Sequence, residues 1–542
     1  MLTAAPVNVQ TVIHRELRGA ARHRETWRLR LAFGIAATLA FTFGMLLPQI
    51  SPRERGLTVL ICLAVAGFGL SLFTGAYLTA DAITREKREG TLGLLFLTPL
   101  RPWEIILGKM VTHSLQVGYA LLGAFPVFFL PLLLGSVLWG EVLRILLVLA
   151  LTLALSLACG MFYSTHLREA RTAVLATMVT MLLLALLPML PPLVRELVHR
   201  QGSLFGVAQL SPMTALIFAF DANFRLSRAS VTGAGAGIYW GSILWLAAGL
   251  AGLLVFTSRQ LSGNWAETGT LQHDAEETAQ SDGRRNRTVP WWALPMHAAP
   301  LLWLAAREAF EPVWVKLVRG GALAFFAFVL LASLTTSNWE VGFIAAFCTA
   351  YGLHLFTRVQ LLLAATQRVH KDRECGALEA ILVTPVSDAE MLQAHHEAFK
   401  RHHWATLLTI LSTNVGLELA MLLGSKQLHM DADTGMIFSV FFLGGALITL
   451  SDFKTLRWVG LREALRQSSQ LKAAGRAFVL TMLVPWMAFA VAWLFAMGTN
   501  HETLVALIFS LWVAACLLYN ECLTFSCQRT LQAGLRRLVA AS

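Results

Sequence analysis

The sequence predicts an all-α, polytopic membrane bundle with about 12 transmembrane helices. The chain has 542 residues, of which 56% are hydrophobic and only 14% are charged, whereas soluble domains usually carry about 25% charged residues. Its mean hydropathy is +0.61. The apolar residues are gathered in long runs separated by short charged segments. Together these observations indicate a chain that crosses a lipid bilayer many times.

The predicted spans follow from the lengths of the apolar runs. A bilayer core of about 30 Å requires about 20 mostly apolar residues in each helix. The run 435–451 is short, so it either spans the membrane or re-enters on the same side. The predicted spans are 30–50, 57–80, 111–136, 143–165, 172–194, 236–257, 318–337, 341–365, 404–424, 435–451, 477–498 and 503–524.

The distribution of basic residues predicts the orientation. The formal net charge is +11, but most Lys and Arg residues lie in the loops that share a side with the N-terminus, as the positive-inside rule requires. Both termini are therefore expected in the cytoplasm, and no nucleic-acid partner is implied. In the cytoplasmic segment 1–28, apolar and arginine side chains alternate at helical spacing over 7–28. This pattern indicates an amphipathic helix on the membrane surface, with a disordered basic tail as the alternative.

A repeated segment divides the chain into two halves. The stretch REKREGTLGLLFLTPLRPWEIILGK, which begins at Arg85, aligns without a gap on KDRECGALEAILVTPVSDAEMLQAH, which begins at Lys371, when shifted by 286 positions. Both copies follow the second span of a six-span half. An even number of spans per half makes this a parallel repeat. The predicted organisation is a first half at 29–258, a cytoplasmic linker at 259–305 and a second half at 306–542.

The first copy resembles the signature of ABC-2 type transporter permeases, the membrane subunits of ATP-driven exporters. The resemblance implies that this segment forms a cytoplasmic coupling region that contacts a nucleotide-binding ATPase subunit, expected in two copies. The alternative is an ordinary charged loop with interfacial leucines. The residues implied in the first copy are Glu86, Glu89, Gly90, Thr91, Thr98, Pro99, Glu104 and Lys109. Those in the second copy are Glu374, Gly376, Thr384, Pro385 and Glu390.

The second copy departs from the first at several positions. Glu89 corresponds to Cys375, and Thr91 corresponds to Ala377. These differences leave open whether both halves couple equally. In the first copy Pro99 ends one helix and Pro102 suits the first turn of the next, so the segment is expected to move as a short rigid element.

The sequence contains no GxxxxGK[ST] motif and no soluble stretch long enough for an ATPase domain. ATP and Mg²⁺ are therefore expected in a separate subunit, and the chain itself is expected to carry no cofactor, no metal and no catalytic residues. The polar linker 259–305 is expected to be a flexible tether between the halves. No set of residues typical of an intramembrane enzyme occurs.

Four polar residues within the predicted spans are candidates for a translocation path or for interhelical hydrogen bonds. These two readings carry equal weight because buried polar groups in membranes serve both purposes. Arg358 is expected nearer the cytoplasm than Glu418, which disfavours a direct contact. The four residues are His354 and Arg358 in the eighth span, and Asn414 and Glu418 in the ninth.

Two further segments were weighed. The run HHEAFKRHH places each histidine seven positions from its mate, which is too far along a helix for one metal ion, so a basic face is favoured over a metal site. The external segment 195–236 has no counterpart in the second half, and its apolar piece at 215–220 is too short to span. A re-entrant or surface-lying element is expected there.

The leading interpretation is a permease subunit of an ATP-driven exporter in a prokaryotic inner membrane. The alternative keeps the fold but assigns a role as a membrane anchor or regulator of an ATPase without transport of its own. The cargo is not indicated by the sequence.

Overall fold

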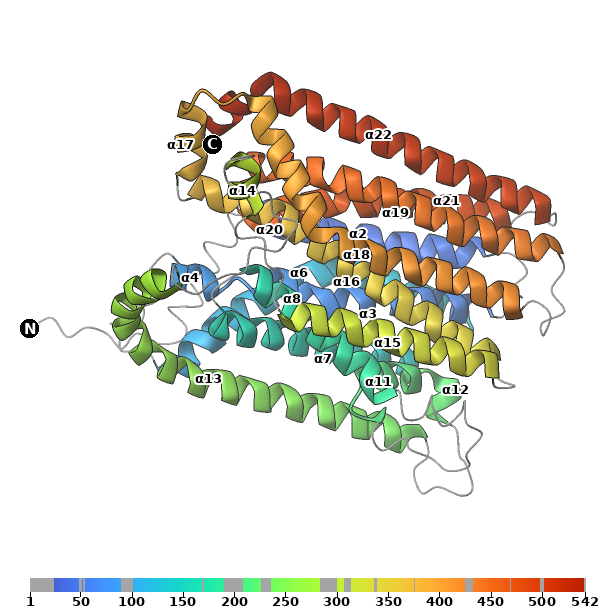
Figure 1. Ribbon diagram of the computed structural model, residues 1–542. Coiled ribbons are helices and arrows are strands. Elements are labelled where there is room, and N and C mark those ends of the chain that lie inside the picture. The colour runs from blue at the N-terminus through green and yellow to red at the C-terminus, as the bar shows by residue number, and fades with distance from the viewer. Residues whose placement is uncertain are drawn as a thin grey trace, which may run out of the picture. The chain divides into compact units, whose positions relative to one another are not determined.

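The computed structural model describes most of the chain as α-helices, and no strand occurs among the residues it describes (Figure 1). These are residues 24–47, 51, 54–88, 101–167, 170–189, 208–225, 235–282, 300–306, 313–335, 339–374, 376–424, 432–467, 469–497 and 502–540. The chain divides into two compact units, Met1–Asn286 and Arg287–Ser542. The boundary between them falls within the segment expected to link the halves.

The first unit is a bundle in which α3 packs against α7 and α2 packs against α6. Its helices are α2 (Arg24–Leu46), α3 (Arg55–Leu78), α4 (Thr84–Arg88), α6 (Pro102–Leu133), α7 (Trp139–His166), α8 (Ala170–Leu186), α11 (Pro212–Ala219), α12 (Asp221–Phe224) and α13 (Gly235–Asp282), with a 3₁₀ turn η1 (Leu187–Met189) after α8.

The second unit is built around the contacts of α19 with α16, α18 and α22. Its helices are α14 (Pro300–Ala306), α15 (Val313–Thr335), α16 (Trp339–Glu374), α17 (Ala377–Val383), α18 (Asp388–Gly424), α19 (Ala432–Arg466), α20 (Gln470–Phe478), α21 (Val484–Met497) and α22 (Glu502–Ala540), with a π-helical turn η2 (Val479–Leu483) before α21.

The all-α membrane fold is confirmed. Each of the twelve predicted spans lies largely on a helix. By length and composition, 7 helices among the described residues are able to cross a membrane, or up to 8 if the two bent parts of α6 form one span. Arg30–Leu46 and Ala170–Leu186 are shorter apolar helices. The run 435–451 belongs to Gly435–Arg466, which is one of the 7, and this favours a span over a re-entrant loop.

The bend in α6 has a local cause. The parts Trp103–Leu121 and Gly123–Leu133 meet at 44°. Pro126 lies inside the helix, where it has no N–H to donate to the carbonyl of Leu122 and its ring clashes with that carbonyl. A proline four residues past the break therefore accounts for the bend.

Helices α3 and α7 approach closely through small residues. A Cβ on Gly75 would lie 2.1 Å from the backbone of Ser156, so only glycine fits there. The Ser156 hydroxyl accepts from the Gly75 N–H at 3.1 Å and donates to the Leu72 carbonyl at 2.7 Å. Membrane helices associate through close van der Waals contact of this kind, supported by interhelical hydrogen bonds.

The expectation of a flexible tether over 259–305 is wrong for its first part. Helix α13 continues from the sixth predicted span to Asp282. The residues beyond the span include many Ala, Glu, Gln and Leu, which favour helix even in a polar sequence. The predicted amphipathic segment 7–28 lies mostly outside the described residues, because α2 begins at Arg24.

The described part of the segment 195–236, which was expected on the external side, packs onto the start of α7 through α11 and α12. The Arg144 guanidinium donates to the Ala219 carbonyl at 2.9 Å and pairs with Asp221 at 3.2 Å. The backbone N–H of Asp221 donates to the Glu141 carboxylate at 3.0 Å. The described part of the segment, 208–225, is therefore a short helical pair tied to the bundle, and α11 has 8 residues, too few to span a membrane.

Candidate functional site

The first copy of the predicted coupling segment is described only at its two ends. Glu86 lies on α4, and Glu104 and Lys109 lie on α6. The remaining candidates of this copy lie outside the described residues: Glu89, Gly90, Thr91, Thr98 and Pro99.

Glu86 and Lys109 form an ion pair that joins the two ends of the segment. Their carboxylate and ammonium groups lie 2.7 Å apart, and both side chains are largely buried. Lys109 also donates to the Ala82 carbonyl at 3.3 Å. The pair thus holds α4 against α6 at the base of the segment, which is an internal contact rather than an exposed one.

The second copy is described almost completely and forms a short exposed helix, α17, between α16 and α18 (Figure 1). Gly376 begins it with φ of 71°, a left-handed conformation that glycine adopts without strain. Leu378 is fully buried and anchors the helix, whereas Val383 is 88% exposed. Thr384 ends the helix and Pro385 follows it. Glu374 is the last residue of α16.

Glu104 and Glu390, which the repeat aligns, make the same contact. The Glu104 carboxylate accepts from the backbone N–H of Arg101 at 2.8 Å. The Glu390 carboxylate accepts from the backbone N–H of Ser387 at 3.2 Å. Both glutamates therefore satisfy a backbone donor at a helix start, where such donors lack partners within the helix. Their role is to start α6 and α18 at equivalent positions.

A second equivalent contact ties the segment to the helix that carries the fourth predicted span of each half, α7 or α19. Lys87 donates to the Thr165 carbonyl at the end of α7. The aligned residue, Arg373, donates to the carbonyls of Leu465 and Gln467 at the end of α19, at 3.4 and 3.1 Å. A cation at a helix C-terminus is favourable because the last carbonyls are unpaired and the helix dipole is negative there.

The two residues that form the ion pair of the first copy are different in the second copy. The positions of Glu86 and Lys109 correspond to Asp372 and His395. Asp372 pairs with Arg368, one turn earlier on the same helix, at 3.0 Å. The two copies thus share their helix starts and their C-terminal contacts but differ in the ion pair that holds the segment.

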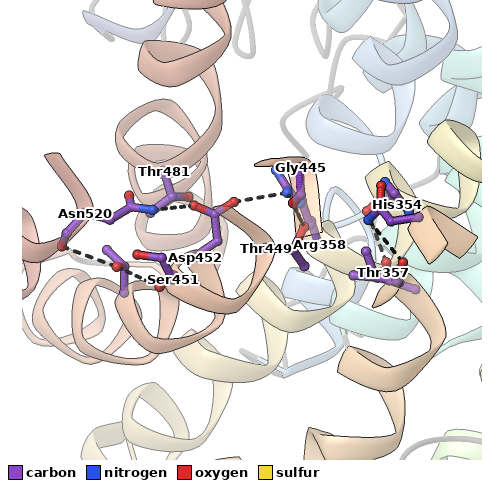
Figure 2. Close-up of polar contacts among 12 residues, drawn as sticks. His354, Thr357, Arg358, Gly445, Thr449, Ser451, Asp452, Thr481 and Asn520 are labelled. Atoms are coloured by element: carbon purple, nitrogen blue, oxygen red, sulfur yellow. Dashed lines mark hydrogen bonds and ion pairs between the residues drawn. The ribbon is translucent and has the colours of Figure 1, made fainter. Parts of the chain in front are cut away.

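A buried polar network crosses the second unit from α22 to α16. Figure 2 shows it running from Asn520 through Asp452 to Arg358. The Asn520 amide donates to Asp452 at 2.7 Å, and the Arg358 guanidinium lies 3.1 Å from the other carboxylate oxygen. Arg358 also donates to Thr449 at 3.1 Å. Asp452 and Asn520 are 3% and 1% exposed, so the charges are paired away from solvent.

The four polar candidates of the spans do not act as one group. Arg358 pairs with Asp452, as above, and not with Glu418. Glu418 instead accepts from the Ser439 hydroxyl at 2.6 Å. His354 shares a hydrogen bond of 2.7 Å with Thr413, and the Asn414 amide donates to the Ile410 carbonyl at 3.2 Å. Glu418 thus makes an interhelical contact between α18 and α19.

Three of these candidates meet at a cavity of about 370 Å³, which we call the polar cavity. His354, Arg358 and Asn414 contribute to its polar wall together with Thr449 and Asp452. The opposite wall is aromatic and apolar and is formed by residues of α19, α21, α22 and the π-helical turn. That wall includes Phe441, Met482, Leu483, Pro485, Trp486 and Trp512.

The π-helical turn η2 beside the cavity lies just before Pro485. In a π-helix the carbonyl of Leu480 would accept from the N–H five residues on, but Pro485 has none. The Tyr519 hydroxyl donates to this carbonyl at 2.9 Å instead. The Pro485 carbonyl in turn accepts from the Trp512 indole at 3.3 Å. The irregular backbone is therefore satisfied by α22 and shapes the cavity wall.

The first unit has a cavity of about 220 Å³ that is lined almost wholly by apolar residues of α2, α3, α6 and α7. The positions aligned with His354, Arg358 and Asn414 are Phe68, Leu72 and Phe128. These three belong to the buried apolar core of the first unit. Polar groups in the second unit thus replace a hydrophobic cluster in the first.

The network residues Thr449, Asp452 and Asn520 were missed from the sequence. The tenth predicted span ends at 451, one residue before Asp452, whereas the helix continues to Arg466. A buried basic residue in a span needs an acidic partner. A search of the neighbouring span ends for a carboxylate would have found Asp452.

The histidine run lies on α18. His396 stacks on Trp458 with ring centroids 5.0 Å apart, and His403 contacts Phe399 at 4.5 Å. Among the described residues no group of three or more His, Cys, Asp or Glu is placed to hold a metal ion.

Comparison with known proteins finds a family match for the first half of the chain. A family described as ABC-2 family transporter protein matches residues 10–261. No curated protein matches the sequence. The class that the fold and the match define is a multi-pass membrane component of a transporter. The ABC-2 family transporter domain matches nearly all of the first unit, so this half of the chain is similar to the ABC-2 type permeases.

Proposed function

We propose that the chain is the membrane-spanning permease subunit of an ATP-driven exporter, powered by two copies of a separate nucleotide-binding subunit. The family match to residues 10–261 supports a permease role for the first half. The two aligned helix-start contacts and the two aligned C-terminal contacts support a second half of the same design. We place the protein in the inner, cytoplasmic membrane with both termini in the cytoplasm.

The observation that carries the coupling role is the exposure of α17. A helix that transmits force must be fixed at its base and open at its face. Leu378 supplies the fixed point, being fully buried, and Val383 supplies an open apolar contact. Arg536 of α22 pairs with Asp388 at the start of α18 at 3.1 Å, so a push on α17 reaches two long helices. The aligned first copy is proposed to do the same.

The test is association with an ATPase. The chain is purified in mild detergent from its native membrane, and ATP hydrolysis that is sensitive to vanadate is measured in the eluate. Val383→Asp is expected to reduce the co-purified ATPase at least about tenfold, because an apolar docking contact tolerates a buried charge poorly. Val383→Ile is the matched control and is expected to retain the ATPase. Equal recovery from both variants would remove α17 from the contact.

A second function is favoured by one observation. The cavity of the first unit is apolar, and a path lined only by apolar residues suits a membrane anchor or regulator of an ATPase better than a transporter of polar cargo. The two functions differ in their ATPase kinetics. A transporter couples hydrolysis to cargo, whereas an anchor leaves the hydrolysis rate unchanged when candidate cargo is added to proteoliposomes.

A further inference from the structure

The polar cavity contains a hydrogen-bond donor that the described residues do not use. Arg358 lines this cavity. One terminal nitrogen of its guanidinium is occupied by Asp452 and Thr449. Its Nε is buried and has no acceptor among the described residues. Because a buried donor group that is not fully paired is unfavourable, a molecule in the cavity that brings an oxygen acceptor to this guanidinium is favoured.

The two opposite charges in the polar wall of the cavity favour a ligand without net charge. Arg358 and Asp452 neutralise each other at 3.1 Å. An anion that approached Arg358 would also meet the Asp452 carboxylate, and a cation that approached Asp452 would meet the guanidinium. Either repulsion is strong in a site of low dielectric, and the ion would also lose its hydration. An uncharged acceptor, such as a carbonyl or hydroxyl oxygen, is not repelled by either charge and does not lose the hydration of an ion.

The opposite wall decides the shape of the molecule. Trp486 and Trp512 line the cavity, and the Trp512 indole N–H is already bonded to the Pro485 carbonyl. These two residues therefore offer large aromatic surfaces against which a planar ring can pack. Trp486 is 41% exposed, which leaves a side of the cavity open at the surface of this unit. A volume of about 370 Å³ is at the lower end of the range typical of small-molecule sites.

We infer that the polar cavity binds an uncharged aromatic molecule that carries a carbonyl or hydroxyl oxygen. The oxygen accepts from Arg358, and the ring system lies between the tryptophans. No comparable site exists in the described part of the first unit's cavity, where apolar residues occupy the aligned positions. The inference concerns binding alone and goes beyond the proposed export function.

The test uses three naphthalene probes that share a dimethylamino group. Prodan, which is 6-propionyl-2-dimethylaminonaphthalene, is uncharged and carries a carbonyl. 2-Dimethylaminonaphthalene lacks the carbonyl, and 6-dimethylamino-2-naphthoate replaces it with a charged carboxylate. Saturable energy transfer from tryptophan to each probe is measured with the full chain in lipid nanodiscs, and empty nanodiscs give the background. We expect prodan to bind about tenfold more tightly than either relative, because 2-dimethylaminonaphthalene has no oxygen to accept from Arg358 and the naphthoate is repelled by Asp452 and loses its hydration.

Two variants locate the site. The double variant Arg358→Met with Asp452→Leu removes the donor and its counter-ion together, because a buried ion pair replaced by apolar residues of similar volume leaves the fold intact. It is expected to bring the affinity for prodan down to that for 2-dimethylaminonaphthalene. Trp486→Ala is expected to weaken both of these uncharged probes. Retention of a single thermal transition shows that each variant is folded.

Two results overturn the inference. One is equal affinity of the wild-type chain for prodan and 2-dimethylaminonaphthalene, which needs no variant at all. The other is unchanged prodan binding in the double variant. These measurements contain no ATPase, so their failure leaves the proposed permease function untouched. Conversely, failure to co-purify an ATPase leaves the binding result untouched.

Discussion

At the scale of single residues, the Arg358–Asp452 pair shows how a polar group is retained inside a membrane bundle. Each partner is buried and each is hydrogen-bonded to a third residue, Thr449 or Asn520. Such a pair contributes little net stability compared with apolar packing, but removal of one partner leaves a buried unpaired charge and strongly destabilises the fold. The network is therefore sensitive to the loss of one member and tolerant of the loss of both charges.

This property gives a stability prediction. Arg358→Met is expected to lower the free energy of unfolding by about 3–5 kcal/mol, because it strands the Asp452 carboxylate. Addition of Asp452→Leu is expected to restore most of that loss. Titration of purified protein with SDS in mixed micelles, followed by tryptophan fluorescence, measures both. A double variant as unstable as the single one would show that the pair itself stabilises the unit.

The contact of α3 with α7 gives a second residue-scale prediction. Gly75→Ala places a methyl group 2.1 Å from the Ser156 backbone, and overpacking of this kind is expected to destabilise the first unit by about 1–3 kcal/mol. Gly69→Ala on the same helix is the matched control, since a Cβ there meets nothing within 4 Å. Thermal unfolding in detergent compares them. Equal transition temperatures would contradict the close helix approach.

The sequence identified the polar residues within the spans, but it did not predict which residues they contact. His354, Arg358 and Asn414 were found because ionisable and amide groups stand out in apolar runs, and all three line one cavity. Glu418 was found by the same signal but contacts Ser439. Which groups meet depends on helix rotation and depth, and a single sequence does not encode these in its periodicity.

At the scale of elements, the apolar runs located helices but not their ends. Helix α16 extends nine residues past 365 to Glu374, because a helix continues in water wherever the residues allow it. The segment after it shows the opposite case. Gly376 and Pro385 align with Gly90 and Pro99 of the first copy, where Pro99 was expected to end a helix, and α17 lies between Gly376 and Pro385. Breakers define short elements well because their effect is local.

Helix α17 gives an element-scale prediction. Gly376→Ala forces a non-glycine residue into the left-handed region and is expected to cost about 1–2 kcal/mol, loosening the start of α17. Gly376→Asn is the control, since Asn tolerates this conformation better. Hydrogen exchange of the amides in 377–383 measures the effect. Unaltered protection in the alanine variant would show that the turn is not needed to hold α17.

At the scale of the whole molecule, the fold class followed from composition alone, whereas the relation of the halves rests on two aligned segments. The family match ends at residue 261, so the second half is assigned by its repeat. Glu104 and Glu390 each accept from a backbone N–H at a helix start, and Lys87 and Arg373 each donate to carbonyls at a helix end. These equivalent contacts are details of backbone capping. The alignment placed these residues together, and the structure supplied their chemistry.

The central claim is that two parallel halves each present their repeated segment to the cytoplasm. Cysteine is introduced at Thr98 or at Thr384 in a variant that lacks the 7 native cysteines, and each site is labelled with a membrane-impermeant maleimide. Our account predicts that both sites react in inside-out vesicles and neither reacts in right-side-out vesicles. Reaction of the two sites from opposite faces of the membrane would contradict it.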